Sequence, residues 1–130
     1  MGKKIIALKI LPDQLRADPV EIEDELKTYQ EYVGGCTERV TFENRFIMIV
    51  NGNGLFEDLP YNKLASALYA SKFCAMSPIV GNAIIVGKDG ENFKSVPFDV
   101  VTYINRLAFY LSKLEDNKAD GKEANEEGTS

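Results

Sequence analysis

The feature that most constrains the fold is an unbroken apolar run, Phe46-Ile47-Met48-Ile49-Val50. A strand that is apolar on both faces has to be covered on both, so this run predicts an inner strand of a sheet. Residues 37 to 42, just before it, are rich in β-branched and aromatic residues, and Glu43-Asn44-Arg45 forms a short connection between the two segments. Together they predict a β-hairpin, which Asn51-Gly52-Asn53-Gly54 ends abruptly.

Strand and helix signals follow one another irregularly along the rest of the chain. Apolar residues in alternating or continuous runs predict strands over Lys4 to Ile10, residues 20 to 23, and Asn82 to Val86, the last closed by Lys88-Asp89-Gly90. Caps and helical spacing predict helices from Asp24, as the cap, to Val33 with Gly34 left-handed after it, from Asp58-Leu59-Pro60 to Phe73, and from Phe98 to Leu114. This order predicts an α+β domain with a mostly antiparallel sheet of about four to five strands, packed by about three helices.

The chain divides into a single domain, residues 1 to 114, and an acidic C-terminal tail, residues 115 to 130. The tail has no aromatic or branched aliphatic side chain, so it buries too little apolar surface to offset the entropy of ordering, and we expect it to be disordered. Its six acidic and two basic residues account for −4 of the net charge of −5. The domain keeps only −1 and has no basic stripe, which argues against a DNA mimic and against direct nucleic-acid binding.

The 130 residues include no histidine, which excludes Ser-His-Asp and Cys-His catalysis and histidine-ligated metals. Cys36 and Cys74 are too few for a disulfide framework or a four-thiolate zinc site, and we expect both to be reduced and buried. We therefore expect no enzymatic activity, no metal and no cofactor. The N-terminal segment is neither a signal peptide nor a membrane span, which predicts a cytoplasmic protein without a membrane partner.

Three polar residues are the candidates for binding a ligand or partner: Asn51, Asn62 and Lys63. An amide both donates and accepts hydrogen bonds, and a strand end and a helix entrance would place the two asparagines at one crevice. Lys63, near a helix N-terminus, suits an anion. Structural roles are the alternatives, because Asn51 suits a turn, Asn62 suits a helix cap, and most lysines are simply exposed.

Four segments, in order and spacing, resemble a small family of domains of unknown function: Val33-Gly34-Gly35, Val50-Asn51-Gly52, Leu59-Pro60-Tyr61-Asn62-Lys63, and Ile79 to Gly87. The resemblance runs from about Lys4 to Phe98. That family is found mainly on phages, plasmids and other mobile elements of bacteria, so the resemblance implies a mobile-element accessory role without an established activity. This chain departs from the family with Tyr61 for Leu, Asn82 for Thr, and Lys63 for Arg, which removes a bidentate anion contact.

Three functions remain open. The favoured one is a non-catalytic accessory protein that binds and modulates a host or defence protein. The alternatives are a small-ligand or nucleotide sequestering protein that uses Asn51, Asn62 and Lys63, and an unrecognised enzyme. A concave pocket rimmed by those three side chains would favour the ligand, and an exposed apolar patch the protein partner. The off-stripe aromatic residues of the last helix also predict a homodimer; they are Phe98, Tyr103, Phe109 and Tyr110.

Overall fold

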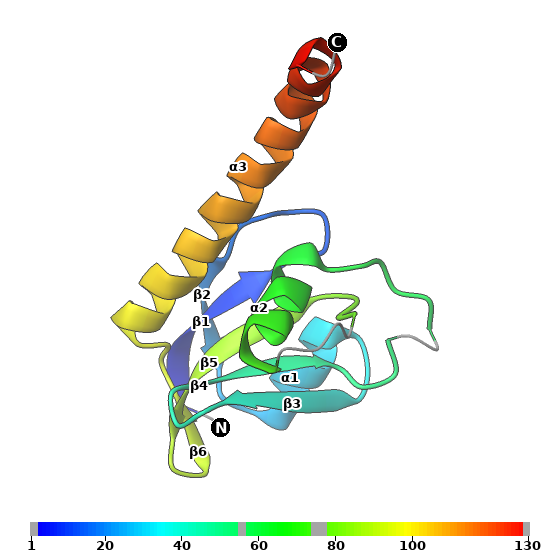
Figure 1. The fold of residues 1–130 in the computed structure, drawn as a ribbon. Coiled ribbons are helices and arrows are strands. Elements are labelled where there is room, and N and C mark those ends of the chain that lie inside the picture. The colour runs from blue at the N-terminus through cyan, green and yellow to red at the C-terminus, as the bar shows by residue number, and fades with distance from the viewer. Residues whose placement is uncertain (1–2, 55–56, 74–77, 129–130) are drawn as a thin grey trace.

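The computed structural model describes residues 3–54, 57–73 and 78–128, with side chains described as far as residue 116. Figure 1 shows the arrangement of these elements. In chain order they are β1 (Lys4–Ile10), β2 (Asp18–Glu23), α1 (Leu26–Val33), β3 (Thr37–Phe42), β4 (Phe46–Asn51), α2 (Lys63–Phe73), β5 (Ala83–Asp89), β6 (Asn92–Lys94) and α3 (Phe98–Gly128).

The strands form one sheet in the order β2-β1-β5-β4-β3, with β6 paired to β5, and all described pairs are antiparallel. This confirms the predicted α+β class. The apolar run forms β4, which is flanked by β5 and β3 and buried at every residue, as predicted. Strand β6 was not predicted from the sequence. Strand β5 continues past the predicted end at Val86 to Asp89, and the chain then turns back into β6 through Gly90, whose positive φ of 62° suits glycine.

Successive residues of β4 point to opposite faces of the sheet, so the strand joins two cores. Met48 and Val50 belong to a core with Leu64 of α2 and Val100 of α3. On the other face, Ile47 and its neighbours pack against α1. The sheet is therefore covered by α2 and α3 on one face and by α1 on the other, with α1 behind the sheet in Figure 1.

Helix α1 ends as predicted and begins differently. Gly34 has a left-handed φ of 80°, and its N–H donates to the carbonyl oxygen of Gln30 at 2.9 Å. Asp24, however, is not the cap. The helix begins at Leu26, and the Asp24 carboxylate instead accepts a hydrogen bond of 2.8 Å from the hydroxyl of Tyr29.

Helix α2 begins at Lys63, later than the predicted start at Asp58-Leu59-Pro60. Residues 60–62 pair with residues 79–81 instead: Tyr61 and Val80 form an isolated antiparallel bridge. The N–H of Asn62 donates to the Ile79 carbonyl at 2.8 Å. These long-range hydrogen bonds keep the segment extended until Lys63.

Helix α3 continues to Gly128, beyond the predicted end at Leu114, and extends past the rest of the molecule in Figure 1. Glutamate, lysine and alanine make up just over half of the added residues, and none of these residues is proline, which permits helix locally. Disorder of residues 115 to 130 stays a prediction. In the described part of the chain, no helix is both long and apolar enough to cross a bilayer.

The prediction that both cysteines are buried can be checked for Cys36 only. Cys36 is a free thiol and is exposed, so the expectation of burial was wrong for it. It lies in the connection between α1 and β3, where the chain leaves the core after the left-handed Gly34. Cys74 lies outside the described residues.

Candidate functional site

Asn51 is the last residue of β4 and is only 6% exposed. Its side-chain Nδ2 donates to the Val33 carbonyl at 3.0 Å and to Glu57 Oε2 at 3.2 Å. Its Oδ1 accepts a hydrogen bond of 2.7 Å from the N–H of Asn53, which forms an Asx turn. The amide thus ties the strand end to helix α1 and to the following turn.

Asn62 precedes the first residue of α2 and is fully buried. Its Oδ1 accepts from the N–H of Ala65 at 3.1 Å, which is the geometry of a helix N-cap. Its Nδ2 donates to the carbonyl oxygens of Ile10 and Gly81 at 3.0 and 2.9 Å. Both amide hydrogens and the amide oxygen are therefore used within the domain.

Lys63 points to α3, where its ammonium forms an ion pair with the Glu115 carboxylate. It lines a groove between α2 and α3, whereas Asn51 lines a separate pocket beside β3. Asn62 is buried and lines none of the described pockets. The structure therefore does not bring the three candidate residues together around one crevice.

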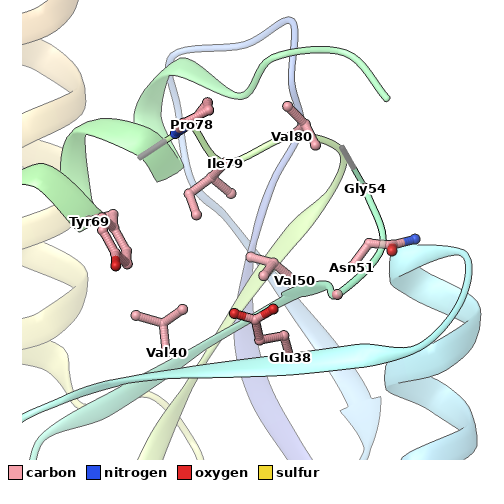
Figure 2. Close-up of a pocket in the computed structure, with 10 residues that line it drawn as sticks. Glu38, Val40, Val50, Asn51, Gly54, Tyr69, Pro78, Ile79 and Val80 are labelled. Atoms are coloured by element: carbon pink, nitrogen blue, oxygen red, sulfur yellow. The ribbon is translucent and has the colours of Figure 1, made fainter. Parts of the chain in front are cut away.

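The pocket beside β3 has a volume of about 160 Å³ and is drawn in Figure 2. Its walls come from β3, the end of β4, α2 and the segment 78–80. In Figure 2 the Asn51 amide turns away from it toward α1, so only the backbone side of that residue contributes. Aliphatic side chains form part of the lining: Val40, Val50, Ile79 and Val80.

Two polar side chains line this pocket, and neither is among the three candidate residues predicted from the sequence. They are Glu38 of β3 and Tyr69 of α2, whose hydroxyl points toward β3 in Figure 2. The Tyr69 ring packs on Phe73 with the ring centroids 4.7 Å apart. Within the described part of the chain, neither the Glu38 carboxylate nor the Tyr69 hydroxyl has a hydrogen-bond or ion-pair partner. Glu38 and Tyr69 become candidate binding residues because the fold brings them to the same pocket from distant segments. No local sequence pattern could have predicted this.

The groove between α2 and α3 is larger, at about 370 Å³. It is lined mainly by apolar and small side chains, among them Tyr61, Ala67, Ala70 and Leu111. Ser71 of α2 and Tyr103 of α3 are joined by a hydrogen bond of 3.2 Å between their hydroxyls. The two helices are thus held together while the groove between them stays open to solvent.

Helix α3 also carries exposed apolar side chains beyond this groove. Phe109 is 65% exposed and Tyr110 is 59% exposed, and Phe98 and Leu114 are exposed too. The ammonium of Lys113 lies 5.4 Å from the Phe109 ring centroid. Exposed aromatic residues on one helix are typical of a protein interaction surface.

The shifted pKa values of the domain have structural causes. Burial raises the pKa of Tyr32 to about 12, and burial together with the hydrogen bond to Asp24 raises the pKa of Tyr29 still further. Hydrogen bonds from Lys72 and Arg45 hold the pKa values of Glu43 and Asp99 below their usual range. None of these groups combines with a nucleophile or base of a recognised catalytic arrangement. Among the residues that the structure describes, no cluster of acidic or cysteine side chains is suited to hold a metal ion.

In comparison with known families, residues 4–108 match the model of DUF3846, a domain of unknown function. This confirms the predicted membership in a family of domains of unknown function; the distribution on phages and plasmids stays a prediction. No curated protein and no solved structure matches the chain.

Proposed function

The chain belongs to the DUF3846 family, and from this membership and the geometry above we propose that it is a non-catalytic protein that acts by binding another protein. The observation that carries the proposal is the exposure of two adjacent aromatic side chains on α3, Phe109 and Tyr110. Covering one such side chain contributes about 1.5–3 kcal/mol, so a few of them support a specific contact. Aromatic residues are also the residues that most often dominate binding energy at interfaces.

The competing small-ligand function depended on Asn51, Asn62 and Lys63 lining one pocket. The two amides instead bind the domain's own groups, and Lys63 is paired with Glu115. A ligand would have to break these hydrogen bonds before making its own, which favours the protein-binding function. Catalysis is the weakest alternative, because among the residues that the structure describes no nucleophile-and-base arrangement supports it.

The finer proposal is that the partner is a host or defence protein of a bacterium, bound in the cytoplasm by a protein encoded on a phage, plasmid or other mobile element. The resemblance of the four sequence segments supports this origin. A small accessory protein that binds without catalysis would modulate its target in proportion to the number of copies bound.

The test is quantitative co-purification from the native bacterium with a tagged chain. A double variant, Phe109→Ser with Tyr110→Ser, should lose the partner, because both side chains are exposed and the fold does not depend on them. The matched control is Leu26→Ser, an exposed apolar residue on α1 across the sheet, which should retain it. If the parent, the double variant and the Leu26→Ser control recover equal amounts of the partner, the assignment of binding to α3 is wrong. If the protein turns over far more than one substrate molecule per chain, the non-catalytic function is wrong.

A further inference from the structure

Strand β3 is one end of the sheet, with β4 as its neighbour on the inner side. The N–H of Gly52 donates to the Cys36 carbonyl at 2.8 Å, which marks a hydrogen-bonded pair just before the Thr37–Asn51 pair. Because hydrogen-bonded and non-hydrogen-bonded pairs alternate in antiparallel sheets, Thr37, Arg39 and Thr41 turn their backbone N–H and C=O groups to the free edge. This edge has the backbone pattern needed to accept a further strand.

The pocket of Figure 2 adjoins this edge, because β3 itself forms one of its walls. Glu38 and Val40 lie on the α2 side of the strand and line the pocket. In a strand added beside β3, every second side chain would lie on that same side. One of these side chains would therefore lie over the pocket.

The chemistry of the pocket indicates which side chain that is. Glu38 is exposed, and within the described part of the chain neither its carboxylate nor the Tyr69 hydroxyl has a hydrogen-bond or ion-pair partner; aliphatic side chains such as Val40 and Ile79 form the walls beside them. The adjacent cation, Arg39, lies on the opposite face, with its guanidinium 4.8 Å from the Phe93 ring centroid. A lysine or arginine satisfies this arrangement, since its stem packs on apolar walls while its cationic end binds carboxylate and hydroxyl oxygens.

The size of the pocket agrees with a single side chain. Its volume of about 160 Å³ is below the roughly 300–1,000 Å³ of sites for free small molecules. We propose that the β3 edge and this pocket form a docking site for an extended segment of a partner protein, which adds a strand to β3 and inserts a lysine or arginine between Glu38 and Tyr69. The inference deepens the proposed protein-binding function.

The first experiment uses the purified full chain and a fluorescent peptide of sequence Thr-Val-Thr-Lys-Thr-Val-Thr, in which the lysine shares a face with both valines. Binding is measured by anisotropy and mapped by amide NMR shifts. We expect shifts of the Thr37, Arg39 and Thr41 amides, which face the edge. A peptide with norleucine in place of lysine keeps the stem and lacks the charge, and it should bind at least about tenfold more weakly.

Variants test the two polar groups of the pocket. Glu38→Gln should weaken the lysine peptide to the level of the norleucine peptide, and Tyr69→Phe should weaken it less, since a neutral donor or acceptor is lost. The matched control is Glu21→Gln, an exposed glutamate on β2 at the other edge of the sheet, which should change nothing. Both pocket substitutions are nearly isosteric, and thermal unfolding checks that each variant is folded.

Several outcomes would overturn the proposal: no binding at millimolar peptide, equal binding of the two peptides, or shifts confined to residues away from β3. Butylamine is a further probe. If it reproduces the full effect at Glu38 and Tyr69 and the peptide adds no shifts along the β3 edge, the pocket binds a free amine and the docking assignment fails. The α3 double variant should bind the peptide like the parent, so a failure here leaves the α3 proposal standing and the reverse also holds.

Discussion

The side-chain amide of Asn51 donates a hydrogen bond of 3.0 Å to the carbonyl oxygen of Val33. Asn51 ends β4 and Val33 ends α1, so a strand terminus satisfies one of the carbonyl groups that a helix leaves unpaired at its C-terminus. Gly34 then turns the chain away in the left-handed conformation. The Asn51 amide, which the sequence suggested as a binding group, thus connects the end of β4 to the end of α1 within the domain.

Asn62→Ala should lower the free energy of unfolding by at least about 2 kcal/mol, because it leaves two buried carbonyls and one N–H without their partner. Urea unfolding followed by circular dichroism measures the change. The control is Asn53→Ala, since Asn53 is exposed and contributes its backbone N–H to the Asx turn; it should stay within about 0.5 kcal/mol of the parent. An Asn62→Ala protein as stable as the parent would contradict the structural role.

Gly34→Val should destabilise the domain by about 1 kcal/mol or more, because a β-branched residue is strained at a φ of 80°. A Cβ at this position meets no atom within 4 Å, so the effect isolates backbone conformation from crowding. Gly34→Asn should lose less, since asparagine tolerates the left-handed region. The ranking of the two midpoints of chemical unfolding is the readout, and the reverse ranking would place the helix end elsewhere.

Deletion of residues 116–130 should change the melting temperature by no more than a few degrees, because this segment has no aromatic or branched aliphatic side chain that could join the core. The cut leaves Glu115 and its ion pair with Lys63 in place. Differential scanning calorimetry of the two chains measures the shift. A large drop would show that the acidic segment packs against the domain.

Stability should fall as the pH rises from 10 toward 12, because Tyr32 has a folded pKa of about 12 against an ordinary value of 10. In this window the unfolded chain loses the tyrosine proton while the folded chain keeps it, so proton release favours unfolding. The stability that the protonated Tyr32 contributes is fully present below pH 10 and is lost as the pH rises through about 12. Denaturant midpoints measured across the window should fall less steeply for Tyr32→Phe than for the parent.

At neutral pH the same Tyr32→Phe variant should be as stable as the parent or slightly more stable. The Tyr32 hydroxyl is buried and has no hydrogen-bond partner among the described residues, so its removal relieves a desolvation cost. A clear loss of stability at neutral pH would indicate a hydrogen-bond partner for this hydroxyl.

Without the partner, we expect a homodimer, in which a second copy covers exposed aromatic residues of α3 such as Phe109 and Tyr110; the partner protein would replace that copy. Light scattering at micromolar concentration should then give twice the chain mass of 14.5 kDa. The Phe109→Ser, Tyr110→Ser chain should give the single mass. A parent mass near 14.5 kDa would rule out the dimer and leave this face to a different protein.

Features that depend on neighbouring residues were predictable. The apolar run of β4 required cover on both faces, and Gly34 marked the end of α1, because strand periodicity and the conformational freedom of glycine act over a few residues. The short connection of three residues between β3 and β4 likewise predicted their antiparallel pairing. The sequence by itself therefore determined the fold class and most of the element order.

The tertiary structure decided the features that join distant segments. Asn62 became a structural residue because the fold brings Ile10 and Gly81 within reach of its amide, and α2 starts late because Tyr61 pairs with Val80. The pocket beside β3 arises in the same way, with Glu38 and Tyr69 meeting from separate elements. Contacts of this kind depend on how segments far apart in the sequence pack together. Side-chain type and local spacing do not determine that packing, so the sequence could not predict them.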